Sequence, residues 1–141
     1  QRPLTEIGIK EARVMGQWLL KKSQVDCVFV SPYIRAQQTA DTVINELGSV
    51  VKRQTLGIIT PEDNAKDVHD YLDAVCSQEQ YKSVLLVSHM PLVSYLVAEL
   101  TVNHVMPMFQ TASVAEIKYD LVKMSGELLD VVSPCDVKQV L

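Results

Sequence analysis

Glycine is scarce in this chain of 141 residues, which contains only five glycines scattered along its length. None of them belongs to a GxxxxGK[ST] loop, whose backbone N–H groups surround the phosphates of a nucleotide. No glycine-rich dinucleotide-binding turn follows any predicted strand either. These absences exclude the two common nucleotide-binding loops. A phosphate site in this chain would be made of side chains, without a nucleotide or a metal.

Basic runs and long apolar segments are also lacking. The formal net charge is −4, no run of Lys or Arg occurs, and aromatic residues do not alternate with basic ones. These features argue against a nucleic-acid partner. The longest apolar runs have the length of a strand or a helix and are interrupted by polar residues, so we expect no membrane-spanning segment.

The three cysteines, Cys27, Cys76 and Cys135, form an odd set without the spacing of metal ligands. None of them has a basic neighbour in the sequence that would activate its thiol. We therefore predict reduced thiols, no metal site and a cytoplasmic location.

The most informative segment is residues 83–91, SVLLVSHMP. Its apolar centre predicts a strand covered on both faces, as in a parallel sheet. Pro91 has a fixed φ and no N–H, so it suits the first turn of a helix over residues 92–100. His89 is thereby predicted at the carboxyl end of a strand and beside the positive end of a helix, where α/β sheets bind anions.

The same arrangement is predicted upstream. Residues 25–30 form an apolar strand, Ser31 caps the following helix and Pro32 takes its first position, while Gly48 ends it. Arg35 then lies in the first helical turn, where the helix dipole disfavours cations. An anionic ligand would compensate for this placement. A solvated surface arginine is the alternative.

The chain starts with a helix capped by Thr5, although a parallel α/β sheet normally places a strand before its first helix. We therefore expect an N-terminal strand that precedes Gln1. Further predictions are a strand over residues 50–56 and a hairpin of residues 113–119 and 127–132, joined by a turn at Ser125-Gly126. The fold predicted for residues 1–141 is a single domain lacking its first strand. It is a three-layer α/β/α sandwich with a mostly parallel sheet and an antiparallel C-terminal hairpin.

Arg35 and His89 are expected at the carboxyl ends of two strands of one sheet. A guanidinium group binds phosphate through two parallel hydrogen bonds. An imidazole donates a hydrogen bond and, when protonated, adds charge. The backbone N–H of Met90 is a candidate third donor at the helix start, and Arg2 is a candidate for the rim of the phosphate site.

Three runs of sequence are shared with a known family: residues 4–12 (LTEIGIKEA), 30–40 (VSPYIRAQQTA) and 87–93 (VSHMPLV). They resemble the histidine phosphatase superfamily, which has the phosphoglycerate mutase-like fold, and the resemblance covers nearly the whole chain. The short length and residues 90–97, 107–109 and 133–135 resemble the bacterial phosphohistidine phosphatases within that superfamily.

The resemblance implies a covalent mechanism in which the histidine of an Arg-His-Gly motif, at the end of the first strand, attacks phosphorus. It also implies that Arg35 and His89 are the second arginine and second histidine, which bind the phosphoryl oxygens, and that no cofactor takes part. The Arg-His-Gly motif matches nothing in residues 1–141. The chain by itself is therefore expected to lack the nucleophile and to turn over nothing.

The remaining acids and histidines are weaker candidates. Related sugar-phosphate mutases carry a glutamate on a long insertion, which this chain lacks. Glu62 and Asp63 are candidate general acids, with a solvated helix start as the favoured alternative. His69 is predicted to form a surface pair with Asp73, four residues on, and His104 to be solvated in a loop.

Without the insertion, the site should be open, which suits a phosphorylated protein better than a small metabolite. We therefore predict a cytoplasmic, metal-independent phosphatase that removes phosphate from a histidine of a signalling or phosphotransfer protein, as in two-component signalling. Two alternatives stay open. One is a small-molecule phosphatase or mutase of the same superfamily, and the other is a non-catalytic module that binds phosphohistidine.

Overall fold

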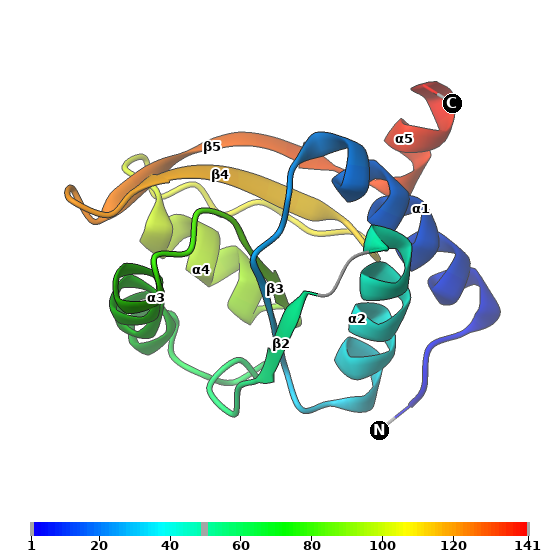
Figure 1. The fold of residues 1–141 in the computed structure, drawn as a ribbon, viewed down its shortest axis with the longest axis horizontal. Coiled ribbons are helices and arrows are strands. Elements are labelled where there is room, and N and C mark those ends of the chain that lie inside the picture. The colour runs from blue at the N-terminus through cyan, green and yellow to red at the C-terminus, as the bar shows by residue number, and fades with distance from the viewer. Residues whose placement is uncertain (1, 49–50, 141) are drawn as a thin grey trace.

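The computed structural model describes residues 2–48 and 51–140 (Figure 1). The helices are α1 (Glu6–Lys22), α2 (Ile34–Leu47), α3 (Ala65–Glu79), α4 (Leu92–Leu100) and α5 (Pro134–Val140). The strands are β1 (Cys27–Val30), β2 (Lys52–Thr55), β3 (Val84–Val87), β4 (Val114–Asp120) and β5 (Ser125–Val132). Within the described residues, no helix has the length and apolar character needed to cross a lipid bilayer.

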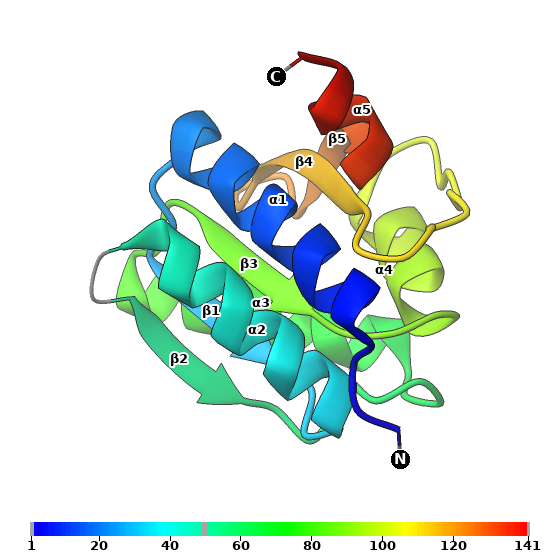
Figure 2. The same ribbon diagram turned by 90° about the vertical axis from the view of Figure 1, so that its right-hand side faces the viewer.

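Three parallel strands, in the order β2-β1-β3, form the centre of the molecule. Helices α1 and α2 cover one face of this sheet, and α3 and α4 cover the other (Figures 1 and 2). The predicted α/β/α sandwich is confirmed. The hairpin β4–β5 is a two-stranded sheet of its own, so the described strands form two sheets and not one mixed sheet.

Strand β1 is the buried centre of the sandwich. Its side chains alternate between two cores, because successive residues of a strand point to opposite faces. Cys27 and Phe29 pack against α3 and α4, whereas Val28 and Val30 pack against α2. Each of the four is at most 1% exposed. The apolar run predicted as a strand is therefore enclosed on both faces.

The strand predicted before His89 is present as β3, but it is half-buried along its whole length. Leu86 packs against the core beside α3 and α4, and Leu85 packs against the core beside α1 and α2. Both faces are thus covered, as predicted. Burial is incomplete because, among the described strands, β3 is paired along one edge only, with β1.

The local sequence predicts some helix ends correctly and others wrongly. Thr5 caps α1 as predicted, with its hydroxyl oxygen accepting the Gly8 N–H at 3.0 Å. Gly48 ends α2 with a left-handed φ of 69°, a conformation that glycine adopts without strain. The predicted start of α2 is wrong, because the helix begins at Ile34 and Tyr33 takes the cap position. The Ser31 hydroxyl accepts the Tyr33 N–H at 3.3 Å, but Ser31 lies three residues before Ile34 and its backbone N–H pairs with β3.

The hairpin β4–β5 is antiparallel, as predicted, but its turn is misplaced in the prediction. The turn comprises residues 121–124, and Ser125 and Gly126 are the first residues of β5. Gly126 is required for close approach of the strands, because a Cβ atom there would lie 2.5 Å from the carbonyl oxygen of Lys118. The glycine that indicated a turn therefore serves strand pairing.

Replacing Gly126 with alanine should lower the free energy of unfolding by about 1–3 kcal/mol, since the new methyl group overlaps backbone that must shift. Gly57→Ala is the matched control, because a Cβ atom at Gly57 meets nothing within 4 Å. Urea unfolding followed by circular dichroism measures both variants. Equal stabilities would contradict the steric role of Gly126.

The three cysteines differ in burial. Cys27 is buried, Cys76 is half-buried and Cys135 is exposed, and all three are free thiols. Burial raises the pKa of the Cys27 and Cys76 thiols, which keeps these two sulfurs protonated and unreactive.

Candidate active site

The carboxyl ends of β1 and β3 lie side by side, because Val30 pairs with Val87 in the parallel register. The backbone N–H of Ser31 donates to the carbonyl oxygen of Val87 at 3.0 Å and extends the pairing by one residue. His89 follows two positions after Val87. The sheet thus brings the two predicted strand ends together, as the sequence indicated.

His89 is held between residues of the β1–α2 connection. Its Nε2 atom lies 2.7 Å from the hydroxyl oxygen of Ser31, and its ring lies 5.0 Å, centroid to centroid, from the tilted ring of Tyr33. The side chain is half-buried, and this burial lowers the pKa of His89 below its usual range, because a buried imidazolium loses hydration. The neutral imidazole is therefore favoured near pH 7 in the free protein.

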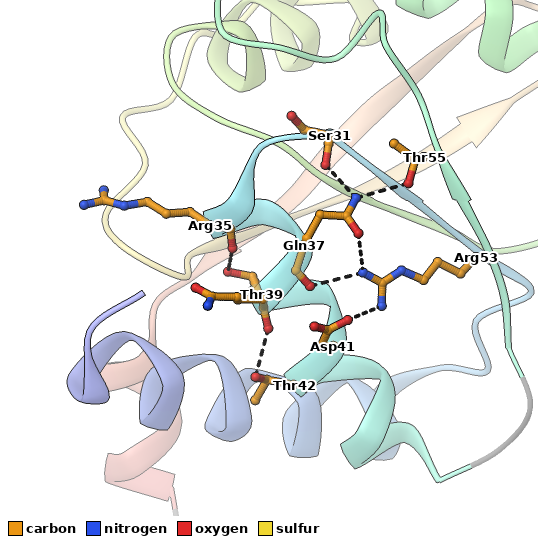
Figure 3. A network of polar contacts seen from close by, with 9 residues as sticks. Ser31, Arg35, Gln37, Thr39, Asp41, Thr42, Arg53 and Thr55 are labelled. Atoms are coloured by element: carbon orange, nitrogen blue, oxygen red, sulfur yellow. Dashed lines mark hydrogen bonds and ion pairs between the residues drawn. The ribbon is translucent and has the colours of Figure 1, made fainter. Parts of the chain in front are cut away.

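Arg35 is the second residue of α2, in the first helical turn as predicted. Its side chain is exposed, and its Nε donates to the carbonyl oxygen of Arg2 at 3.3 Å. It points away from the polar cluster around Ser31 and Gln37 (Figure 3). The structure thus brings Arg35 to the Arg2 backbone. In the part of the chain that the structure describes, no hydrogen bond joins Arg35 to His89, and their joint action on one anion stays a prediction.

A polar network that the sequence analysis missed fixes the β1–α2 connection (Figure 3). Gln37 donates from Nε2 to the carbonyl oxygen of Ser31 at 2.9 Å and to the hydroxyl of Thr55 at 3.1 Å. Arg53 of β2 donates to the side-chain oxygen of Gln37 at 2.7 Å and forms an ion pair with Asp41. The polar composition of β2, KRQT, is the one sequence feature that hinted at such a role.

Met90, proposed for its backbone N–H, follows His89 and is 37% exposed. The Ser94 hydroxyl donates to the carbonyl oxygen of Pro107 at 2.5 Å and also lies 3.0 Å from the Met90 sulfur. Ser94 thereby holds the loop containing Pro107 against the start of α4. Donation from the Met90 N–H to an anion stays a prediction.

The acidic candidates are separated by their contacts. Asp63 accepts hydrogen bonds from the N–H and the hydroxyl of Thr60, at 2.7 and 2.5 Å, and so closes the turn before α3. Glu62 is exposed. The contacts of Asp63 favour a structural role, whereas a catalytic role for either acid stays a prediction.

The prediction that His69 lies on the surface is wrong. Its pairing with Asp73 is present, at 3.3 Å, but His69 is buried and its Nε2 lies 2.6 Å from the hydroxyl of Tyr119 on β4. Its Nδ1 lies 3.4 Å from a carboxylate oxygen of Glu99 on α4, and the Tyr119 hydroxyl donates to Asp73. Burial, together with this bond to Asp73, raises the pKa of Tyr119. The helical spacing predicted the Asp73 contact but not the strand that covers it.

His104 agrees with its prediction, since it is exposed and lies in the loop after α4. Its Nδ1 lies 3.0 Å from the carbonyl oxygen of Ala98. Within residues 2–48 and 51–140, no group of three His, Cys, Asp or Glu side chains is placed to hold a metal ion.

Comparison with known proteins indicates the family of this chain. Residues 2–59 match the family model described as histidine phosphatase superfamily (branch 1). Phosphohistidine phosphatase SixA of Escherichia coli (strain K12) is 39% identical over 138 residues, which cover 97% of this chain and 84% of that protein. The chain belongs to the histidine phosphatase superfamily. A SixA homolog of Haemophilus influenzae is 40% identical over 128 residues, covering 84% of this chain and 77% of that one.

Solved structures of the superfamily carry the same fold. The structure of the protein histidine phosphatase SixA complexed with tungstate superposes with a TM-score of 0.90 at 39% identity, covering 96% of this chain and 86% of that one. A SixA-like protein of Nakamurella, 23% identical with a TM-score of 0.78 over 95% of this chain and 86% of that one, shares the fold. The overall fold of this chain is thus that of the SixA structure.

Proposed function

We propose that this protein is a phosphohistidine phosphatase, which removes the phosphoryl group from a histidine of another protein. The observation that carries the proposal is the 39% identity to SixA of Escherichia coli, which extends over 97% of this chain. The sheet supports it, because His89 and the helix bearing Arg35 both follow the carboxyl ends of adjacent parallel strands, where such folds bind anions.

The proposed reaction has two steps. A nucleophilic histidine attacks phosphorus, the bond between phosphorus and the substrate imidazole breaks, and the leaving nitrogen takes up a proton. Water then cleaves the enzyme phosphohistidine and releases inorganic phosphate. Arg35 and His89 hold the phosphoryl oxygens in both steps, assisted by the Met90 N–H, while Arg2 lines the rim. These contacts stabilise the charge that is spread over the equatorial oxygens.

The nucleophile is assigned to an Arg-His-Gly motif, which residues 1–141 do not contain. We propose that a strand carrying this motif completes the domain. The described strands leave one edge of β3 unpaired, and this edge supports the proposal. Its backbone N–H and C=O groups could pair with a further strand, which would then end close to His89.

A protein substrate is favoured over a metabolite by the exposed surroundings of His89. Tyr33, whose ring lies beside the imidazole, and Met90, the next residue in the chain, are each 37% exposed. Large, partly apolar, exposed side chains are typical of protein interfaces. The free thiols support a reducing compartment, and we propose the cytoplasm. We further propose that the partner is a signalling or phosphotransfer protein of the two-component type.

A second candidate function is phosphoryl transfer on a small metabolite. A 2,3-bisphosphoglycerate-dependent phosphoglycerate mutase of Methylorubrum populi is 38% identical over 71 residues, which cover 50% of this chain and 31% of that enzyme. This partial identity is the observation that favours the second candidate. The much larger size of the mutase leaves most of that enzyme without a counterpart in this chain.

A substrate competition tests the proposal. The chain is extended at Gln1 with a strand that carries an Arg-His-Gly motif, and is given a phosphohistidine protein and sugar phosphates side by side. We expect faster release of phosphate from the protein, because the open site accepts a protein surface. Faster hydrolysis of a sugar phosphate would favour the second candidate, and binding without turnover would favour a non-catalytic module.

A further inference from the structure

Ser31 is the residue at which the two halves of the candidate site meet. It is completely buried. Its backbone N–H donates to Val87 on β3, and its carbonyl oxygen accepts from Gln37 on α2. Its hydroxyl oxygen accepts the Tyr33 N–H at 3.3 Å and lies 2.7 Å from Nε2 of His89. The position of this hydroxyl is therefore fixed by both neighbouring elements.

The hydrogen-bond inventory sets the direction of the contact with His89. A serine hydroxyl has one proton to donate, and a buried hydroxyl normally donates it. The Tyr33 N–H already occupies one lone pair of the Ser31 oxygen, and His89 Nε2 is the acceptor within reach at 2.7 Å. Donation from Ser31 requires an unprotonated Nε2, so the proton of the neutral ring resides on Nδ1.

We propose that Ser31 is a positioning residue, which donates its hydroxyl proton to His89 Nε2 and so presents the Nδ1–H of the ring to the phosphoryl group. Among residues 2–48 and 51–140, Nδ1 of His89 has no hydrogen-bond partner, which leaves it available as the donor. The catalytic role of this arrangement rests on the proposed function. The hydrogen bond and the tautomer do not depend on that function.

The charge environment agrees with a neutral ring. Burial is the cause that lowers the pKa of His89, and the side chains in contact with it, Ser31 and Tyr33, are uncharged. A donor to the neutral form acts in the same direction, because it stabilises the unprotonated nitrogen. Neutral His89 then binds an oxyanion through one fixed N–H, without first losing or gaining a proton.

Imidazole ¹⁵N NMR of the ligand-free chain tests this tautomer directly. Above the titration of His89, we expect a protonated Nδ1 and an unprotonated Nε2. A ring protonated at Nε2 would overturn the proposal, and this measurement needs no variant that must first be shown to fold. It also needs no turnover, so a failure here is distinct from a failure of the substrate competition.

Ser31→Ala should raise the pKa of His89 and weaken the tautomer preference, because the neutral ring loses its donor. Binding of inorganic phosphate, followed by the same NMR signals, should weaken about threefold to tenfold, the size expected for one neutral hydrogen bond. Ser88→Ala is the matched control, since the Ser88 hydroxyl lies beside His89 in sequence but donates to the carbonyl oxygen of Ile59 at 2.6 Å. A His89 pKa that falls or stays unchanged in Ser31→Ala, or that rises equally in Ser88→Ala, would refute the positioning role.

Discussion

Arg35→Ala should lower the turnover of a phosphohistidine protein by about 100-fold or more, the effect of removing a donor from a transition-state oxyanion. The Arg35 guanidinium can hold two phosphoryl oxygens at once, which neither the His89 ring nor the Met90 N–H can do. The fold should be unaffected, because the side chain is exposed and its bond to the Arg2 carbonyl oxygen is a surface contact. Turnover is measured in the chain extended with the Arg-His-Gly strand, and stability by thermal unfolding.

Two further variants sharpen this test. Arg35→Lys keeps the charge but loses the planar fork, so its turnover should lie between those of the unchanged protein and Arg35→Ala. Arg13→Ala removes another exposed arginine, on the outside of α1, and should leave turnover unchanged. If Arg35→Ala retained full turnover, Arg35 would have no part in the reaction. Its side chain would then serve only the surface contact with the Arg2 backbone.

Phe29→Ala should lower the free energy of unfolding by about 3–5 kcal/mol, the usual cost of deleting a fully buried aromatic ring. Phe29 is 0% exposed at the centre of β1. It makes edge contacts with Tyr71 at 5.9 Å and Tyr81 at 6.4 Å, centroid to centroid. The central strand has no alternative side chain to fill this space, so a cavity remains. Urea unfolding of the chain measures the loss.

Tyr95→Ala provides the aromatic control for this second prediction. Tyr95 lies on α4 and is 51% exposed, so its loss should change the free energy of unfolding by about 1 kcal/mol or less. A comparable loss in both variants would show that β1 does not form the centre of the core.

Elements with a strong local pattern were predictable. The apolar stripe of α1 is predictable from the helical spacing of Ala12, Met15 and Leu19, and all three are buried. The start of α2 is not predictable in this way, because Ser31 and Pro32 have the residue types of a helix start while the β1–β3 ladder extends through Ser31. Hydrogen bonding to a strand 56 positions away cannot be read from the local sequence.

The site shows the same division. The place of His89 at a strand end followed from an apolar run and a proline, whereas its bond to Ser31 depends on the parallel register of β1 and β3. His69 is the clearest failure. Its helical neighbour Asp73 was identified, but Tyr119 covers it from a strand 50 residues away, which turned a predicted surface pair into a buried cluster.

The amino-acid sequence by itself determined the class of the fold, the identity of the strands that carry the site, and the family, because periodic burial and short motifs are local properties. Only the tertiary structure decided which hydroxyl meets His89, which way Arg35 points and how far β3 is covered. Those outcomes depend on register and on packing between segments distant in the chain. The free energies that select them arise only once the strands have been paired and the helices placed on their faces.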